Sequence, residues 1–269
     1  MKHRWLIVLS ILCSAAFVRA QPAAPAAPAA SAPAMKPQPA DVPAPKLDPK
    51  TGEPQKQFMD KHAKYVERAK HGDIDILFMG DSITEGWNTR GKDVWKARYA
   101  DRKAANFGIG GDRTQHVLWR AMDGELENIH PKVAVLMIGT NNIGRDISKA
   151  DPAEQIADGI TKIVNLVREK TGAKVLLLAI FPRSDAKEDQ IDVVQKRQHE
   201  VNDIIKKLDD GKNVRYLDLW DKFIGPDGKN VPNEIMADHL HPGDKGYGIW
   251  ADAMEPLLKE MLGGGDSAK

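Results

Sequence analysis

Five apolar runs recur along the chain and are separated by segments with helical periodicity. The runs ILFM at 76–79, KVAVLMI at 132–138 and KVLLLAI at 174–180 are apolar at consecutive positions, as strands buried on both faces are. Shorter runs occur at 103–107 and 214–219. We therefore predict a five-stranded, mostly parallel sheet.

Helical patterns fill the intervals between these runs. The third interval has clear boundaries, because Asp151 and Pro152 are typical start signals and Gly172 is a typical stop. Strands that alternate with helices predict a three-layer α/β/α sandwich. The expected helices cover residues 58–71, 113–126, 151–172, 188–211 and about 245–262.

The first fifty residues differ in composition from the rest of the chain. Residues 1–20 have a basic start, an apolar run and small residues before Gln21, which is typical of a secretory signal peptide. Residues 21–52 are rich in Ala and Pro, so we expect a disordered linker. The folded domain is expected at 53–263 and a disordered tail at 264–269. These features predict an exported protein, periplasmic or secreted.

Charge and cysteine content narrow the function classes. The apolar run of the signal is shorter than the ~20 residues that span a bilayer, so we expect no stable membrane insertion after cleavage. Cys13 is the only cysteine, which leaves the mature protein without disulfides or thiolate chemistry. Removing Lys2, Arg4 and Arg19 leaves 36 basic and 38 acidic residues. This near-balance gives no reason to expect a nucleic acid partner.

Small and polar residues gather where the predicted strands end. The segments are GDSIT at 80–84, NFGIGGD at 106–112, GTNN at 139–142 and, near the C-terminus, DHLH at 238–241. Ligands bind at the carboxyl ends of strands in open α/β sheets, so these segments are the candidate site. Within the first segment alone, Ser82 is equally well a nucleophile or a helix cap.

A serine hydroxyl needs a base that is oriented by a carboxylate before it acts as a nucleophile. Asp238 and His241 offer this pair at a spacing that fits one turn. A metal site at His239 and His241 is the weaker alternative, because two such residues in an extended segment point in opposite directions. We expect Asp81 to shape the turn before Ser82 rather than to transfer protons.

Ester hydrolysis also needs hydrogen-bond donors for the developing oxyanion. Gly110 and Gly111 can expose a backbone N–H, and Asn141 or Asn142 can supply a side-chain amide. Taken singly, these residues also fit a glycine turn and ordinary caps. Their occurrence on one rim of one sheet favours a serine esterase that needs no metal or cofactor.

The ordered set of motifs resembles the SGNH, or GDSL, esterase and lipase superfamily. Ser82 lies in the family's GDS block, Gly111 and Asn141 match its glycine and asparagine blocks, and Asp238 with His241 match its last block. The resemblance implies a flavodoxin-like sheet, a Ser82–Asp238–His241 triad and an oxyanion hole of Ser82, Gly111 and Asn141.

A more specific likeness is to the catalytic subunits of intracellular platelet-activating factor acetylhydrolase, through NFGIGGDRTQHVLWRAMDGELENIHPKVAVLMIGTNN and DHLHPGDKGYGIW. It implies a preference for short acyl groups, with Ile83, Thr140 and Leu240 limiting the acyl pocket, and it implies a homodimer. The alcohol part of the substrate stays open between an acetylated carbohydrate and a phospholipid, as in a lysophospholipase-like enzyme. A non-catalytic binding module of the same fold is the rival interpretation.

Overall fold

A computed structural model describes residues 38–263 of the protein. The predicted signal peptide, the first part of the predicted linker and the tail at 264–269 lie outside the described residues. The predicted sheet is confirmed, and every neighbouring pair of strands is parallel, in the order β2-β1-β3-β4-β5. The strands are β1 (Ile76–Gly80), β2 (Ala104–Gly108), β3 (Val133–Met137), β4 (Lys174–Leu178) and β5 (Val214–Leu217).

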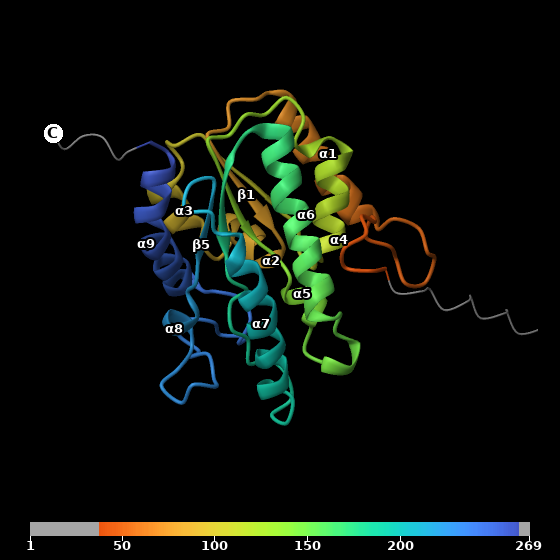
Figure 1. Ribbon diagram of the computed structural model, residues 1–269, viewed down its shortest axis with the longest axis vertical. Helices are drawn as coiled ribbons and strands as arrows, with labels where there is room; N and C mark the ends of the chain where they lie inside the picture. Colours follow the sequence, from red (N-terminus) through yellow and green to blue (C-terminus); the bar gives the residue numbers. More distant parts are fainter. Residues whose placement is uncertain (1–37, 264–269) are drawn as a thin grey trace, which may run out of the picture. The chain divides into compact units, whose positions relative to one another are not determined.

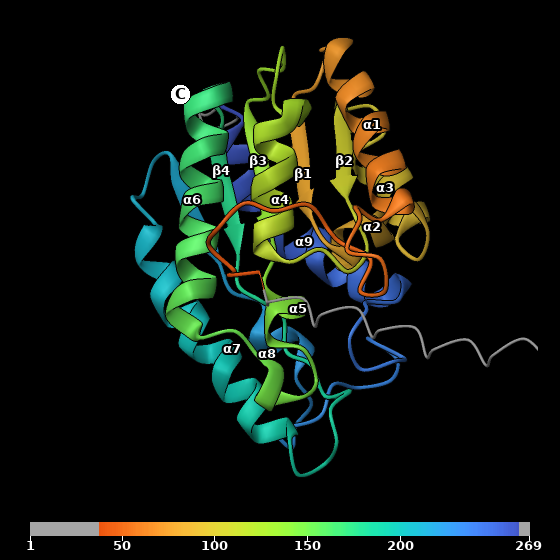
Figure 2. The same cartoon turned by 90° about the vertical axis from the view of Figure 1, so that its right-hand side faces the viewer.

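Helices cover both faces of this sheet, which gives the predicted three-layer sandwich (Figures 1 and 2). Among residues 38–263, none of the helices is long and apolar enough to cross a membrane. The helices are α1 (Lys56–Lys70), α2 (Ser82–Glu85), α3 (Lys92–Arg98), α4 (Thr114–Arg120), α5 (Thr140–Ile143), α6 (Ala153–Thr171), α7 (Ile191–Ile205), α8 (Trp220–Phe223) and α9 (Asp244–Met261).

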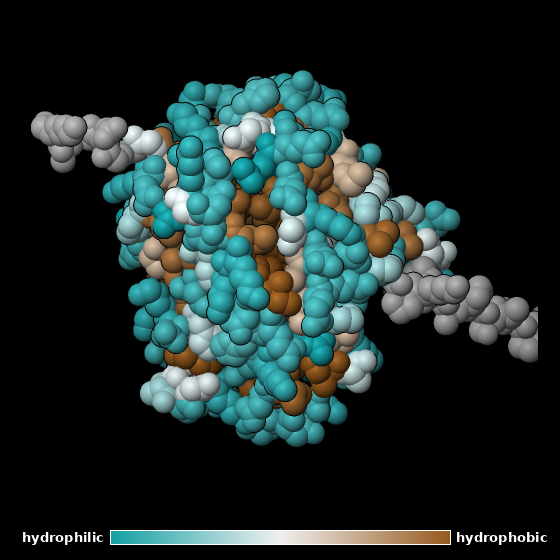
Figure 3. Space-filling model, viewed as in Figure 1, coloured by the Kyte–Doolittle hydropathy of each residue, from teal (hydrophilic) through white to brown (hydrophobic). Residues whose placement is uncertain are grey.

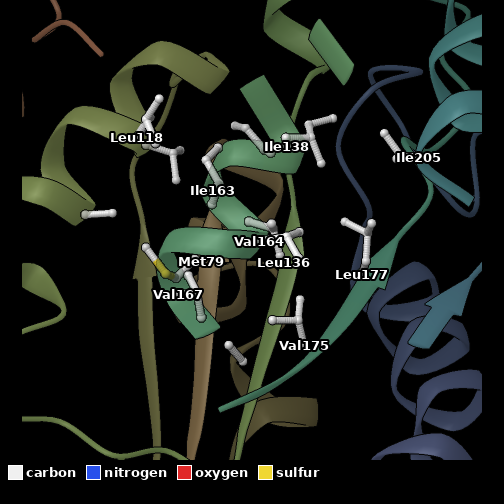
Figure 4. Packing of buried hydrophobic residues seen from close by; sticks show 14 of the residues in the cluster. Met79, Leu118, Leu136, Ile138, Ile163, Val164, Val167, Val175, Leu177 and Ile205 are labelled. Atoms are coloured by element: carbon white, nitrogen blue, oxygen red, sulfur yellow. The ribbon is translucent and has the colours of Figure 1, made fainter. Parts of the chain in front are cut away.

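The sheet separates two hydrophobic cores. Leu77 and Met79 of β1 point into the core shared with α1, α4, α6 and α7, whereas Ile76 and Phe78 point into the core shared with α3, α8 and α9. This alternation follows from the period of two in a strand. Figure 4 shows Met79 packing in the first core. On the face shown in Figure 3, hydrophilic residues dominate, and the hydrophobic residues are visible in a narrow central strip and in smaller groups near the lower end.

Strand register brings the chemically interesting loops to one rim. Gly80 at the end of β1 is paired with Gly108 of β2 on one side and with Met137 of β3 on the other. The chain therefore leaves all three strands at the same level. As a result, the segments that follow β1, β2 and β3 emerge next to one another.

Some helices differ from the sequence prediction. The helix expected at 113–126 stops as α4 at Arg120, because Asp123 and Gly124 in the next turn have non-helical backbone angles, with φ of 103° at Gly124. Helix α3 was not predicted. It is short and none of its residues is fully buried, so its sequence carries little periodic signal.

Residues 38–55, which we call the N-terminal strap, lie against the domain. Ala40 is fully buried, and its carbonyl oxygen accepts a hydrogen bond from Thr114 Oγ1 at 2.6 Å. Lys162 of α6 forms an ion pair with Asp41 at 2.9 Å. Figure 2 shows the strap, in orange, passing across α6 and α4. The expectation of a disordered linker is therefore wrong for residues 38–52, which are held by specific polar contacts rather than by apolar mass.

Candidate active site

The turn between β1 and α2 presents Ser82 at the rim of the sheet. A Cβ at Gly80 would lie 2.2 Å from Thr84 Oγ1 and 2.3 Å from the Met137 carbonyl oxygen, so only glycine fits there. Asp81 is the N-cap of α2, and its Oδ1 accepts a hydrogen bond from the Ile83 N–H at 2.9 Å. Asp81 therefore bonds a backbone amide of the turn, as expected, and the Ser82 hydroxyl is not needed as the helix cap.

Ser82, His241 and Asp238 form a continuous chain of hydrogen bonds. Ser82 Oγ lies 2.8 Å from His241 Nε2, and His241 Nδ1 lies 2.9 Å from Asp238 Oδ2. Asp238 Oδ1 accepts from the backbone N–H of His241 at 2.7 Å. The hydroxyl of Tyr247 in α9 donates to the Ile83 carbonyl oxygen at 2.7 Å, which ties the C-terminal segment to α2. The contact between Ser82 and His241 joins two residues that are 159 positions apart in the sequence.

The surroundings of Asp238 favour its ionised form. Burial acts to raise the pKa of Asp238, but hydrogen bonds from the backbone N–H and the imidazole of His241 outweigh it and hold the pKa below its usual value. Arg90 Nη2 also lies 3.2 Å from Asp238 Oδ2. An ionised carboxylate can fix the imidazole with Nδ1 protonated, which leaves Nε2 as the acceptor for the serine proton.

The glycine loop after β2 lies beside Ser82. A Cβ at Gly110 would be 3.8 Å from Ser82 Cβ, and Gly111 has φ of +73°, a conformation that favours glycine. Within residues 38–263, the backbone N–H groups of Ser82 and Gly111 have no hydrogen-bond partner. Both are therefore available to an anionic oxygen.

The two asparagines after β3 have different surroundings. Asn141 is half-buried and donates through Nδ2 to the Asp112 carbonyl oxygen at 2.8 Å, which places it against the glycine loop. Asn142 is buried, accepts from the Thr114 N–H and donates to Gln115 and Asp151. Asn142 is thus engaged in packing, and Asn141 is the candidate donor.

The residues expected to limit the acyl pocket have unequal positions. Ile83 is buried, and Leu240 is half-buried against the core to which Ile83 belongs. Thr140 is buried, and its hydroxyl accepts a hydrogen bond from Arg183 at 3.3 Å. His239, the second residue of the alternative metal site, makes a hydrogen bond through Nδ1 to the Val231 carbonyl oxygen at 3.0 Å.

A buried charge network that the sequence did not predict lies behind the site. Arg120 is fully buried, lies 2.9 Å from Asp112 through Nε, and donates through Nη2 to the Gly80 carbonyl oxygen at 3.0 Å. It also pairs with buried Glu125, which lies 3.0 Å from His62. The available signal was a charged residue within the otherwise apolar stretch VLWRAM, because buried charges are rarely found without partners.

Comparisons with known proteins find similarity both in sequence and in fold. The platelet-activating factor acetylhydrolase IB subunit alpha1 of Homo sapiens is 34% identical over 208 residues, which cover 77% of this chain and 84% of the relative. The structure of a GDSL-like lipase from Bacteroides thetaiotaomicron superposes with a TM-score of 0.62 at 18% identity, covering 74% of this chain and 97% of that one. An acetylxylan esterase from Geobacillus stearothermophilus has a TM-score of 0.52 at 19% identity, with 71% and 95% covered.

The family assignment rests on a longer stretch of sequence than any single motif. The sequence model of the GDSL-like lipase/acylhydrolase family matches residues 78–249. This range begins within β1, before Ser82, and ends within α9, after His241. The chain therefore belongs to the GDSL-like lipase/acylhydrolase family.

Proposed function

We propose that this protein is a serine esterase that hydrolyses short-chain esters, above all acetyl esters. The observation that carries the proposal is the Ser82–His241–Asp238 chain, with 2.8 Å between Ser82 Oγ and His241 Nε2. A hydroxyl in this contact can lose its proton as it attacks a carbonyl carbon. Membership of an acylhydrolase family supports the same reaction class.

In the first half of the reaction, His241 Nε2 takes the proton of Ser82 as Oγ bonds to the ester carbonyl carbon. The carbonyl oxygen becomes an oxyanion, which the N–H groups of Ser82 and Gly111 and the Asn141 amide stabilise. When the oxyanion collapses, the C–O bond to the alcohol breaks and His241 passes its proton to the leaving oxygen. An acyl enzyme on Ser82 and a free alcohol result.

In the second half, a water molecule replaces the alcohol. His241 removes a proton from the water as it attacks the acyl carbon, and the same donors stabilise the second oxyanion. Collapse breaks the bond to Ser82 Oγ, which regains its proton from His241. Asp238 keeps its charge throughout and stabilises the imidazolium that forms in both halves.

Acetyl esters are the proposed substrate class for two reasons. Ile83, Thr140 and Leu240 leave room for a compact acyl group if they border the carbonyl site. In addition, one relative is named an acetylhydrolase and one protein of similar fold an acetylxylan esterase. As the substrate we propose an acetylated carbohydrate, and a short-acyl phospholipid is the second candidate. Export by the predicted signal peptide fits an extracytoplasmic glycan.

The test is hydrolysis of p-nitrophenyl acetate by a Ser82→Ala variant. We expect its kcat to fall at least about a thousandfold, because the nucleophile is lost. A Ser148→Ala variant, altered in an exposed segment outside the site, serves as the matched control and should retain the parental rate. Parental activity in Ser82→Ala would refute the proposal.

Two further measurements separate the rival interpretations. A fluorophosphonate should label the parent at Ser82, whereas a folded protein without labelling would indicate a non-catalytic binding module. Activity should also persist after EDTA treatment. Loss of activity with EDTA and its return with added zinc would favour a metal site at His239 and His241 instead.

A further inference from the structure

The peptide unit between Gly110 and Gly111 is held by a residue from outside the predicted domain. The Gly110 carbonyl oxygen accepts a hydrogen bond from Lys46 Nζ of the N-terminal strap at 2.7 Å. The Gly110 N–H donates to Glu85 Oε2 at 2.7 Å, and Glu85 is the last residue of the helix that begins at Ser82. The loop is thus held from the strap on one side and from the helix of the nucleophile on the other.

Because of peptide geometry, the Lys46 contact also determines the direction of the Gly111 N–H. The carbonyl oxygen and the N–H of one trans peptide point in opposite directions, because the six atoms are coplanar. Fixing the oxygen on Lys46 therefore fixes the N–H on the opposite side. Neither flanking residue has a side chain, so little else opposes rotation of this peptide.

The surroundings of Lys46 make the contact strong. Only 12% of its side chain is exposed, its ammonium lies 2.8 Å from fully buried Asp112, and the Phe58 ring lies 5.5 Å away. A charged donor forms a stronger hydrogen bond than a neutral one, particularly away from water. An ammonium on the carbonyl oxygen also polarises the peptide, which makes the Gly111 N–H a better donor.

The second proposed donor depends on the same loop. Asn141 Nδ2 is bonded to the Asp112 carbonyl oxygen, while the Asp112 carboxylate is paired with both Lys46 and Arg120. Lys46 therefore contacts the loop at Gly110 and at Asp112. The positions of the Gly111 N–H and of the Asn141 amide therefore both depend on the loop that Lys46 holds.

We propose that Lys46 is a positioning residue of the oxyanion hole, so that the N-terminal strap is part of the catalytic apparatus. This inference rests on the proposed esterase function. Lys46 does not touch the reacting atoms; it holds the Gly110–Gly111 peptide in the orientation that presents the Gly111 N–H. Its loss should slow acylation and deacylation without weakening substrate binding in the ground state.

The first test compares Lys46→Met with Lys162→Met. Lys162 secures the same strap through Asp41, and within residues 38–263 its ammonium forms no hydrogen bond or ion pair with the loop. With p-nitrophenyl acetate we expect Lys46→Met to lower kcat about ten- to a hundredfold, which is at or below the loss caused by removing an oxyanion donor outright, and to change KM less than about threefold. Lys162→Met should retain kcat within about twofold. Parental kcat in folded Lys46→Met would overturn the proposal.

The second test separates the ammonium from packing and covers the case in which Lys46→Met does not fold. Because Cys13 is the only cysteine, a Lys46→Cys variant in a full-length Cys13→Ser background has one thiol. Alkylation in urea with 2-bromoethylamine, then refolding, restores an ammonium at the length of lysine. Alkylation with 1-bromopropane gives the neutral isostere. We expect recovery of most of the parental kcat only with the ammonium, at equal melting temperatures, and equal kcat in the two products would overturn the proposal.

Ser82→Ala in the same assay distinguishes a failure of the esterase mechanism from a failure of the proposed role of Lys46. If Ser82→Ala keeps the parental rate, the esterase mechanism itself fails, whatever Lys46 does. If Ser82→Ala is inactive and Lys46→Met and both alkylated products match the parent, the mechanism stands and only the role of Lys46 fails.

Discussion

Asp238 binds His241 twice, through Oδ2 to the ring Nδ1 at 2.9 Å and through Oδ1 to the backbone N–H at 2.7 Å. Both oxygens of one carboxylate thus engage one residue, which fixes the imidazole relative to its own backbone. The ring has little freedom to turn Nε2 away from Ser82. The short Asp-x-x-His spacing is therefore a device for orientation as well as for charge.

We expect an Asp238→Asn substitution to lower kcat by about 10² to 10⁴ with little change in the melting temperature. An amide can donate to Nδ1, which would leave the proton on Nε2 and remove the acceptor for Ser82. Arg90→Gln is the control, because Arg90 meets the same Asp238 oxygen from an exposed position and such ion pairs contribute at most about 1 kcal/mol. Equal losses in the two variants would contradict this assignment.

The buried carboxyl of Asp81 predicts a stability that falls as pH rises. Burial raises the pKa of Asp81 to about 7, although the Ile83 N–H opposes the shift. In the unfolded chain this carboxyl loses its proton near pH 4. Between these values the folded state binds more protons than the unfolded state, so the Asp81 contribution to stability declines from about pH 4 to about pH 7.

An Asp81→Asn variant isolates this effect, because its side-chain oxygen can still accept from the Ile83 N–H. We expect the stability of the parent relative to the variant to fall by about 2 to 3 kcal/mol between pH 5 and pH 8. Urea unfolding at both pH values measures the difference. A difference that is independent of pH would show that Asp81 is ionised throughout.

The compact residues near Ser82 predict selectivity for short acyl chains. Across p-nitrophenyl esters from acetyl to octanoyl, we expect kcat/KM of the parent to decrease with length. A Leu240→Ala variant should reduce the difference in kcat/KM between the acetyl and the octanoyl ester. Leu240 is only half-buried, so its truncation opens space at limited cost in stability. Faster turnover of octanoyl than of acetyl by the parent would exclude the compact pocket.

The Arg120 network predicts a large stability loss from a single substitution. Arg120→Met would leave the carboxylates of Asp112 and Glu125 buried without their guanidinium partner, which typically costs about 3 to 5 kcal/mol. Arg98→Met, which breaks the exposed pair with Asp252, should cost less than about 1 kcal/mol. Urea unfolding of both variants at pH 7 measures the two losses in the free energy of unfolding. Similar losses would mean that Arg120 contributes no more to stability than an exposed arginine does.

The sheet and the Asp238–His241 pair could be predicted from the sequence because their signals are local. The buried strands are continuous apolar runs, and Asp238 and His241 lie within one turn of each other. The parallel order then brings Ser82, Gly111 and Asn141 to one rim, since Gly80, Gly108 and Met137 are in register. Pattern and topology are sufficient for these features.

The docking of the strap could not be predicted, because its contacts are polar and distant in sequence. Lys46 meets Gly110 across 64 positions, and Lys162 meets Asp41 across 121. Neither contact leaves a periodic pattern, and the Pro-rich composition of the strap is typical of a linker. Helix α3 escaped prediction for the related reason that it is too short and too exposed for a clear periodicity.

The position of the strap has a consequence for how activity arises during folding. It precedes the first strand in the chain, but its partners Thr114 and Lys162 belong to α4 and α6. The strap is therefore synthesised first, but it can dock only after α4 and α6 have formed. If Lys46 orients the Gly110–Gly111 peptide, a newly collapsed chain would already hold Ser82 near His241 yet turn over slowly. The shortest fully active fragment would then include the strap, and maturation would be a docking step that follows folding.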